Sequence, residues 1–211
     1  ILEGLLLRNM SLLNEYENLC LGTDDLVMGI DEAGRGPLCG PLVVAGCVFP
    51  VGYNNELIND SKKLSEKKRD ILYNQIVEDA LYYCIKIVEP KEIDELNIYA
   101  ATKKAMSEIA SSYDVKYVLT DAMPIVDNEK VIPIIKGDAK SISIAGASIL
   151  AKVTRDKIMY EYDKLYPEYE YRKHKGYPTK RHLELLKEYG IFDIYRMSYG
   201  PCKDPNLKRR G

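Results

Sequence analysis

Four carboxylates in this sequence stand at or just beyond the ends of apolar, strand-like runs. Asp31 and the adjacent Glu32 follow the first run, and Asp121 and Asp138 follow two later runs. Charged groups at the end of a buried strand are costly unless something pairs with them. A divalent cation is a suitable partner, because hard cations such as Mg²⁺ bind carboxylate oxygens. Plain turn chemistry, in which an acidic pair precedes glycine, explains Asp31 and Glu32 equally well.

A glycine-rich turn, Gly34-Arg35-Gly36, follows the first two carboxylates. Glycine lacks a Cβ atom, so its backbone amides and carbonyls can approach a ligand closely. The turn does not match a nucleotide-binding loop. Cys39 stands where a dinucleotide fingerprint needs its third glycine, and no Gly-Lys-Ser/Thr follows. Asp31 and Glu32 can share one site only if their strand ends or bulges there, because successive side chains on a strand point to opposite faces.

The elements that must position these residues alternate along the chain. Hydrophobic patterning and turn signals predict the following: strands over 26–31, 42–49, 81–88, 117–121 and 131–136, and helices over 66–80, 90–112, 141–165 and 179–189. Such an order predicts an α/β fold with a mixed sheet and helices on both sides. Thr179 is the expected cap of the last helix and Gly190 its stop. The basic end, 208–210, is expected to lack a fixed structure.

Composition limits the possible functions. The chain has 211 residues with a formal net charge of -2, so the whole chain is not a basic nucleic-acid binder. Positive charge is concentrated in residues 172–182, which hold five Lys or Arg and no acid, and in a second cluster between 62 and 69. Such local patches suit phosphate binding, although solvated surface charge is the simpler explanation for either.

Cysteine and histidine usage indicate the compartment and exclude one kind of metal site. Five cysteines, an odd number without paired spacing, favour reduced thiols and a cytoplasmic protein. Two histidines make a His-rich zinc site implausible. No apolar run approaches the ~20 residues that span a membrane, and the N-terminal stretch does not have the pattern of a signal peptide.

Longer motifs carry a family resemblance. The run Gly29-Ile-Asp-Glu-Ala-Gly-Arg-Gly-Pro-Leu-Cys-Gly-Pro41 resembles the signature of ribonuclease HII. Other blocks of that family occur in the right order, at 59–64, 118–121, 136–138, 147–156 and 173–177. The resemblance covers roughly residues 24 to 200. It implies a ribonuclease H-like mixed five-stranded sheet flanked by helices, in a catalytic domain at 23–200. The near-helical spacing of apolar residues over 5–20 predicts an N-terminal helical arm at 1–22, and residues 201–211 are expected to form a basic tail.

The resemblance also implies an activity and its cofactors. The expected protein is a metal-dependent endoribonuclease that hydrolyses the RNA strand of RNA/DNA hybrids. It would also nick 5′ to single ribonucleotides embedded in duplex DNA, leaving 3′-hydroxyl and 5′-phosphate ends. Two divalent ions, Mg²⁺ or Mn²⁺, would act on the attacking water and the leaving oxygen. No obligate protein partner and no membrane are expected, and the protein is expected to be a monomer.

Site roles follow from the same resemblance. The catalytic set falls on Asp31, Glu32, Asp121 and Asp138, with the first three as metal ligands. Asp138 is explained nearly as well as a helix cap before Ser141. The resemblance implies that the turn Gly34-Arg35-Gly36 grips the ribose 2′-hydroxyl, with Arg35 on a phosphate and Tyr177 against the next sugar. Tyr177 could also be one more surface tyrosine among 17.

Further nucleic-acid contacts are expected at Ser61, Lys62, Ser148, Lys152, Arg155, Lys173 and Lys175. Ser148, Lys152 and Arg155 fall at i, i+4 and i+7, on one helical face, where a hydroxyl and two cations can hold a phosphate. A solvated helix face is the alternative. Tyr195 and Tyr199 stand where the family more often has His and Phe, so no substrate contact is predicted for the C-terminal segment.

Three rival interpretations remain. The related ribonuclease HIII type tends to lack the arginine of this turn and carries an extra N-terminal domain. A non-catalytic nucleic-acid binding module does not need clustered acids. A phosphate-binding metabolic enzyme explains neither the basic stretch nor the spread of carboxylates. Metal-dependent nicking of a duplex that carries one ribonucleotide would distinguish the expected ribonuclease HII activity from both the binding module and the metabolic enzyme.

Overall fold

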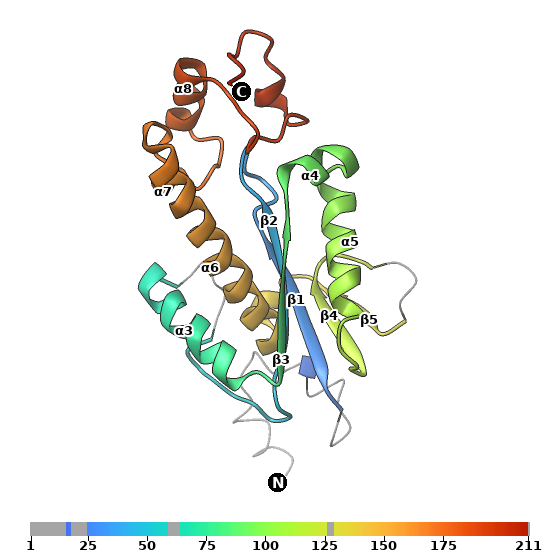
Figure 1. Cartoon of the computed structure of the whole chain (residues 1–211). Coiled ribbons are helices and arrows are strands. Elements are labelled where there is room, and N and C mark those ends of the chain that lie inside the picture. Colours follow the sequence, from blue (N-terminus) through green and yellow to red (C-terminus); the bar gives the residue numbers. More distant parts are fainter. Residues whose placement is uncertain (1–15, 18–24, 59–63, 126–128, 211) are drawn as a thin grey trace.

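A single mixed sheet forms the centre of the described chain. The computed structural model describes residues 16–17, 25–58, 64–125 and 129–210 (Figure 1). Within these ranges, five strands are arranged in the order β3-β2-β1-β4-β5. Their bounds are β1 Val27–Ala33, β2 Leu42–Val48, β3 Tyr82–Val88, β4 Tyr117–Asp121 and β5 Val131–Ile134. The β1–β2 and β2–β3 pairs are antiparallel, whereas β1–β4 and β4–β5 are parallel. The predicted mixed sheet is confirmed.

Helices connect β2 to β3 and β3 to β4, and further helices follow β5. Their bounds are α3 Glu66–Asp79, α4 Pro90–Leu96, α5 Ile98–Ala110, α6 Ile142–Leu165, α7 Tyr171–His174 and α8 Lys180–Tyr189, with short 3₁₀ turns at Gly137–Ala139 (η1), Pro167–Tyr169 (η2) and Gly200–Lys203 (η3). Thr179 caps α8 as predicted, since its hydroxyl accepts a hydrogen bond from the His182 amide. Gly190 ends that helix at a φ of 90°.

The helical region predicted over 90–112 is two helices. Asn97 adopts a φ of 66° and a ψ of 160°, a backbone conformation that is strained for a residue with a Cβ atom. Its side chain accepts from the Ala100 amide and caps α5. The chain therefore turns at Asn97 before α5 begins.

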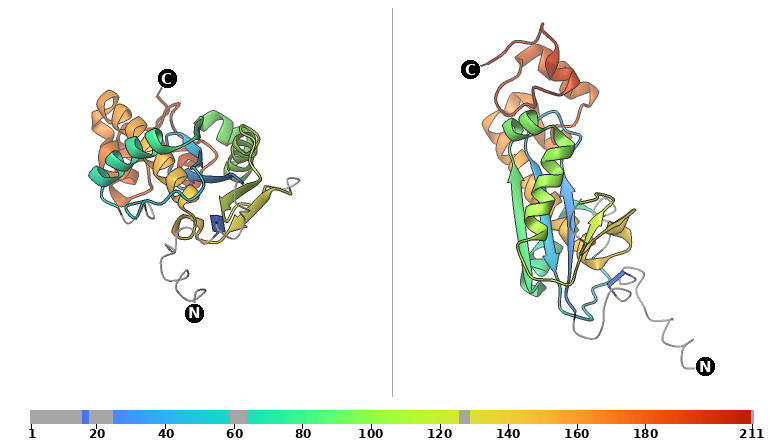
Figure 2. Two further views of the ribbon diagram at one scale, coloured as in Figure 1. Left: turned by 90° about the horizontal axis from the view of Figure 1, so that it is seen from below. Right: turned by 90° about the vertical axis from the view of Figure 1, so that its right-hand side faces the viewer.

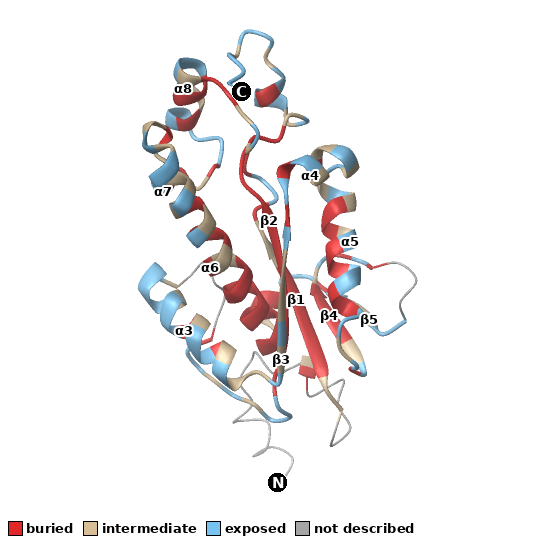
Figure 3. Ribbon diagram, viewed as in Figure 1, coloured by how far each residue is buried: buried red, intermediate tan, exposed pale blue. Residues whose placement is uncertain are grey.

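Helices cover both faces of the sheet (Figures 1 and 2). On one face, α5 packs against β1 and β2 in a cluster that includes Met28, Ile30, Met106 and Ile109. On the other face, α3 and α6 form a second cluster. Strands β1 and β2 are buried along most of their length (Figure 3). Full burial of each large aliphatic side chain contributes about 1.5–3 kcal/mol, so these two layers hold the central strands in place.

A third cluster lies beyond one end of the sheet, where α7, α8 and the C-terminal segment gather (Figure 1). Much of the tyrosine content of the chain is found here. The hydroxyls of Tyr171 and Tyr195 are 2.8 Å apart, and Tyr169 donates to the Gly190 carbonyl at 2.9 Å. These tyrosines are buried, and their hydroxyl groups are satisfied by one another and by the backbone.

The expectation that residues 208–210 lack a fixed structure is wrong. Arg209 forms a bridge with Ile191, and the Arg210 amide donates to the Ile191 carbonyl at 2.8 Å. The Arg210 side chain pairs with Glu168 at 3.0 Å. The predicted N-terminal arm lies outside the described residues except for Tyr16 and Glu17, which are helical. Within the described chain, no helix is long and apolar enough to cross a membrane.

Candidate active site

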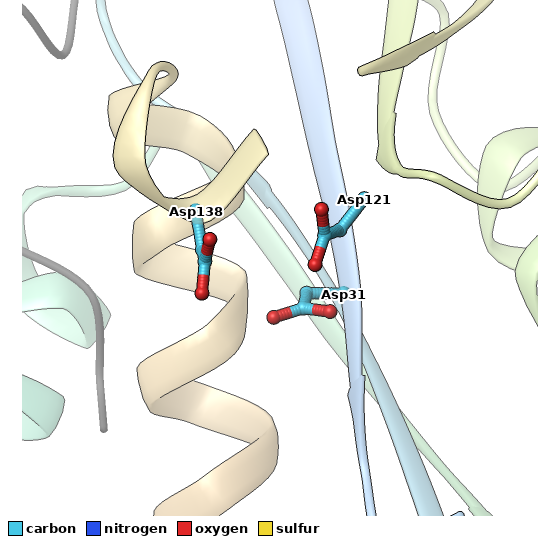
Figure 4. A group of neighbouring side chains, drawn as sticks. All are labelled: Asp31, Asp121 and Asp138. Carbon is cyan, nitrogen blue, oxygen red and sulfur yellow. The ribbon is translucent and has the colours of Figure 1, made fainter. Parts of the chain in front are cut away.

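Three aspartates converge beside the central strands (Figure 4). Asp31, Asp121 and Asp138 each offer a carboxylate oxygen, and these atoms all lie within 4.8 Å of one another. Asp31 comes from β1, Asp121 from the end of β4 and Asp138 from η1. Asp31 and Asp138 are each only 5% exposed. The structure therefore brings together three of the four carboxylates singled out in the sequence.

Strand register places the first two. Strands β1 and β4 run parallel, with Ile30 opposite Thr120, so the residue that follows each occupies the same level of the sheet. The Asp121 carboxylate accepts a hydrogen bond from the Gly137 amide at 2.8 Å. That bond ties the end of β4 to the turn that carries Asp138.

A close contact between β1 and α6 brings in the third aspartate. A Cβ atom at Gly29 would lie 2.1 Å from the Ser143 carbonyl carbon, so only glycine fits there. The first turn of α6 can therefore press directly against β1. Asp138 comes just before this helix, so the close packing of α6 on β1 places its carboxylate near that of Asp31.

Two expectations about these residues are corrected. Asp31 does not end its strand, because β1 stays paired through Ala33, with Asp31 opposite Ala45 and Glu32 opposite Val44. Asp138 is not the helix cap, because Ser141 fills that role by accepting from the Ile144 amide at 3.1 Å. Long-range pairing with β2 extends the strand past the point where its apolar pattern stops.

Glu32 lies outside the group of three aspartates. Successive residues of a regular strand alternate between faces, and the β1 pairing runs without interruption through Glu32. Its carboxylate accepts a long hydrogen bond from Arg35 at 3.5 Å. The Glu32 charge nevertheless raises the pKa of Asp31, so the two groups interact electrostatically. The metal-ligand role of Glu32 stays a prediction.

The aspartate group fits a divalent cation. Burial raises the pKa of Asp31 well above its ordinary value of 3.8, and the charges of Glu32 and Asp121 raise it further. A hydrogen bond with Ser148 acts in the opposite direction. An oxygen-only set of ligands with several like charges is what a hard cation binds, and a cation would relieve this repulsion.

The turn after β1 is braced by two buried arginines. Gly34 has a φ of 100°, and a Cβ atom there would lie 2.1 Å from the Arg155 Nε. Arg155 donates to three carbonyls, those of Pro41, Cys39 and Lys175, at 2.9, 3.2 and 3.1 Å. Burial lowers the pKa of Arg155 to about 10. The guanidinium group therefore stays charged at neutral pH and is fully used in holding backbone.

Arg196 acts in the same way from the C-terminal segment. Its fully buried side chain donates to the carbonyls of Gly34 at 2.7 Å, Arg35 at 3.0 Å and Gly40 at 2.9 Å. A buried guanidinium needs several acceptors, and the turn supplies them. Arg196 carried no signal in the sequence, because its partners lie about 160 residues earlier in the chain.

Tyr177 lies next to the glycine turn. A Cβ atom at Gly36 would lie 3.4 Å from the Tyr177 ring, which is 44% exposed. The Leu38 amide donates to the Gly176 carbonyl at 2.8 Å and ties the two segments together. The turn and Tyr177, both predicted to contact the substrate, are thus adjacent.

A histidine pair that sequence reasoning missed supports Tyr177. The rings of His174 and His182 stack with centroids 4.1 Å apart. His182 Nδ1 lies 2.9 Å from the Tyr177 carbonyl, which can only accept, so this nitrogen carries the proton. Its Nε2 then accepts from the Tyr195 hydroxyl at 3.0 Å. The chain has two histidines, and both lie within the basic stretch 172–182. Their closeness in the sequence was the available signal that they could form a pair.

The predicted phosphate-binding face of α6 is largely buried. Ser148 bonds with Asp31, Lys152 pairs with Asp156 at 2.6 Å, and Arg155 is engaged by carbonyls. A solvated helix face is therefore wrong for these positions, and the phosphate contacts stay predictions. The geometry does not favour a phosphate contact for Arg155, because its guanidinium group donates to backbone carbonyls.

The basic stretch around α7 remains at the surface in part. Lys173 is well exposed and pairs with Glu170 at 2.7 Å, whereas the Lys175 ammonium lies 4.3 Å from the Tyr160 ring centroid. Ser61 and Lys62 lie outside the described residues.

Solved structures with this fold define the class. The ribonuclease H2 of Pyrococcus horikoshii matches with a TM-score of 0.73 and 28% identity, covering 86% of this chain and 97% of that one. The chain matched in the PCNA:RNase HII complex of Archaeoglobus fulgidus gives a TM-score of 0.71 at 28% identity, covering 83% and 95%. The fold, with its clustered aspartates, is that of the type 2 ribonucleases H.

Sequence relatives narrow the assignment. The ribonuclease HII model matches residues 28–202. Ribonuclease HII of Bacillus cytotoxicus is 47% identical over 195 residues, covering 91% of this chain and 75% of that protein. The Clostridioides difficile protein is 55% identical over 177 residues, covering 81% and 68%. The chain belongs to the ribonuclease HII family and is an endoribonuclease.

Proposed function

We propose that this protein hydrolyses the RNA strand of RNA/DNA hybrids and nicks duplex DNA 5′ to a single embedded ribonucleotide, leaving 3′-hydroxyl and 5′-phosphate ends. The supporting observation is one juxtaposition. Three carboxylates lie within 4.8 Å of one another, and one of them, Asp31, is on the strand that leads into a braced glycine turn, with Tyr177 beside that turn. Phosphodiester hydrolysis and ribose recognition would thus take place side by side.

Asp31, Asp121 and Asp138 would hold Mg²⁺ or Mn²⁺, with Glu32 as a further ligand. When bound, such ions would activate the attacking water and stabilise the leaving 3′-oxygen. The chain prepares the ligands for this role. Ser148 holds the Asp31 carboxylate and the Gly137 amide holds that of Asp121 at 2.8 Å, so neither is free to rotate. Burial of Asp31 and Asp138 excludes bulk water and strengthens their interaction with a cation.

The turn Gly34-Arg35-Gly36 would read the sugar. A ribose 2′-hydroxyl is what distinguishes RNA from DNA, and a glycine backbone can approach it closely. The Arg35 side chain is 44% exposed, which leaves it accessible to a phosphate. The exposed Tyr177 ring beside Gly36 would pack against the neighbouring sugar.

Lys173 and Lys175 would contact backbone phosphates from α7. We expect the protein to act as a monomer without an obligate protein partner. Cys39, Cys47, Cys84 and Cys202 are all unpaired thiols, which supports action in the reducing cytoplasm.

Cleavage of three end-labelled duplexes tests the function. They are all-DNA, DNA with one ribonucleotide, and DNA with a run of at least four ribonucleotides. With Mg²⁺ or Mn²⁺, we expect nicking 5′ to the lone ribonucleotide, cleavage within the run and no cleavage of all-DNA. Activity on the run alone would contradict recognition of a single ribose.

A further inference from the structure

The C-terminal segment of the described chain, residues 191–203, is fastened to the glycine turn. The Gly40 amide donates to the Ile194 carbonyl at 2.8 Å, and the Arg196 amide donates to the Leu38 carbonyl at 2.9 Å. On its other side, the segment is held by α4. Asp94 accepts from the amides of Met197 and Ser198 at 2.7 and 2.9 Å. The segment therefore bridges α4 and the turn.

Two side chains of this segment converge on the turn carbonyls. The Tyr199 hydroxyl donates to the Arg35 carbonyl at 2.6 Å and accepts from the Arg196 Nη1 at 3.0 Å. Arg196 itself donates to the carbonyls of both Gly34 and Arg35. The Tyr199 ring also lies over this guanidinium, with the Arg196 Cζ 5.2 Å from its centroid. One charged group and one hydroxyl thus fix two consecutive peptide units.

Fixing a carbonyl also aims an amide. In a trans peptide, the carbonyl and the following N–H lie in one plane and point in opposite directions. Holding the Gly34 carbonyl therefore directs the Arg35 N–H away from Arg196, and holding the Arg35 carbonyl does the same for the Gly36 N–H. These amides belong to the turn that would contact the ribose.

We propose that Arg196 and Tyr199 are positioning residues of the turn, and that the Tyr199 hydroxyl sharpens the discrimination between ribose and deoxyribose. This inference rests on the proposed function of the turn. Arg196 supplies the charge that holds both peptide units. Tyr199 restricts rotation of the second unit, whose carbonyl would otherwise have only the Arg196 bond at 3.0 Å.

Tyr199→Phe removes this hydroxyl and keeps the ring. Its matched control is Tyr169→Phe, because the Tyr169 hydroxyl also donates to a backbone carbonyl, that of Gly190 at 2.9 Å, and receives an arginine donor, Arg210 at 3.5 Å. The Tyr169 hydroxyl makes these bonds with residues that follow α8 and not with the glycine turn. The two variants lose equivalent bonds in different places.

The measurement is steady-state nicking of a duplex with one ribonucleotide, with the all-DNA duplex as a competitive inhibitor. For Tyr199→Phe, we expect kcat/KM to fall about fivefold, the effect of one neutral hydrogen bond. The inhibition constant of all-DNA and the half-saturating metal concentration should stay unchanged, because phosphate contacts and carboxylates are untouched. Tyr169→Phe should match the wild type in all three quantities.

Three results would overturn the proposal: an unchanged kcat/KM in Tyr199→Phe, an equal fall in Tyr169→Phe, or a parallel weakening of all-DNA binding. The last would indicate general loosening and not altered ribose reading. A wild-type protein that fails to nick the one-ribonucleotide duplex would instead remove the proposed function, and this inference with it. Melting temperatures of both variants should lie close to that of the wild type, which shows that each is folded.

Discussion

The carboxylate of Asp31 is expected to stabilise the site only when a cation is bound. Asp31 is buried, its pKa is raised by burial and by neighbouring charges, and it shares its surroundings with Asp121 and Asp138. Without a cation, its ionised form is unfavourable in the folded state. The carboxylate that the proposed activity requires is therefore expected to destabilise the metal-free fold.

Asp31→Asn separates these two effects. We expect nicking activity to fall at least about a hundredfold, because a metal ligand becomes a neutral amide. The metal-free variant should melt at the same or a higher temperature than the wild type near pH 7. A raised carboxyl pKa means that the folded state binds more protons than the unfolded state, so stability is lost as pH rises above about 3.9 through the raised value.

The check is thermal unfolding at pH 4 and pH 7, with and without Mn²⁺. The difference between variant and wild type should shrink at pH 4, and Mn²⁺ should stabilise only the wild type. Asp114→Asn is the control, because that side chain is fully exposed. Nicking by Asp31→Asn at the wild-type rate would contradict the metal-site assignment.

Gly36 and Gly34 are expected to respond differently to alanine. A Cβ at Gly36 meets only the Tyr177 ring, at 3.4 Å or more, so Gly36→Ala should fold normally. If the turn approaches the ribose closely, the kcat/KM of Gly36→Ala should still fall about tenfold or more. The added methyl group would displace the substrate, and a small misplacement of reacting groups is costly in rate. Gly34→Ala has a φ of 100° and a clash at 2.1 Å with Arg155, and should lose roughly 1–3 kcal/mol of stability.

Parallel measurements of kcat/KM and chemical unfolding distinguish the two cases. Wild-type kinetics in a folded Gly36→Ala variant would show that the ligand does not approach this position closely.

At the scale of elements, local sequence patterns placed most strands and helices. Strand β4 was predicted at its observed bounds, 117–121, because its apolar run is short and sharply bounded. The patterns failed where a distant partner decides the outcome. Pairing with β2 extends β1 past Asp31, and Ile191 fixes the C-terminal residues. The break at Asn97 carries no Gly or Pro to signal it in the sequence, so local patterning predicts one continuous helical region.

The site, like the fold, could be predicted only where local sequence patterns indicate it. Strand ends and motif resemblance indicated Asp31, Asp121 and Asp138, and the structure gathers them. The bracing roles of Arg155 and Arg196 depend on contacts more than 110 residues apart, and no local pattern encodes those. Arg155 was assigned to phosphate because charge is visible in a sequence whereas burial is not.

The basic element α7 leads to a prediction about salt. Replacing Lys173 and Lys175 together by alanine should weaken binding to hybrid duplex and reduce the slope of log K against log salt by about 2, because each lost phosphate contact releases one fewer counterion. Lys103 and Lys104 of α5, the helix on the sheet face away from α6, form the control pair. Anisotropy titrations between low and moderate salt provide the slopes. An unchanged slope would place the duplex on another surface.

At the scale of the whole molecule, the sheet and the tyrosine-rich cluster meet at the glycine turn. The histidine pair lies within the tyrosine-rich cluster, and His182 links Tyr177 to Tyr195. Burial and the neighbouring His174 lower the pKa of His182 to about 4. A protonated His182 could no longer accept from the Tyr195 hydroxyl, so acid should loosen this part of the molecule.

Stability should therefore fall as pH drops from 6.5 towards 4. In this window the unfolded chain protonates His182 and the folded protein does not, a difference of about 1.4 kcal/mol per pH unit. The measurement is urea unfolding of Asp31→Asn, a background that removes the opposite contribution of the Asp31 carboxyl. Adding His182→Gln should reduce the pH dependence and leave the part that comes from His174, whose pKa burial also lowers. A free energy of unfolding that is constant between pH 6.5 and 4.5 would contradict the buried neutral histidine.

The order of the strands leaves β3 and β5 at the margins of the sheet. Each margin carries a residue that discourages further strand pairing. Strand β5 is four residues long and contains Pro133, which has no amide proton to donate, and β3 carries Lys86, paired with Glu108 of α5. A neighbouring copy of the chain would meet a short edge at β5, and at β3 a seven-residue edge that carries the charged Lys86. Resistance to edge-to-edge aggregation during refolding at high protein concentration is thus built into the two outermost strands.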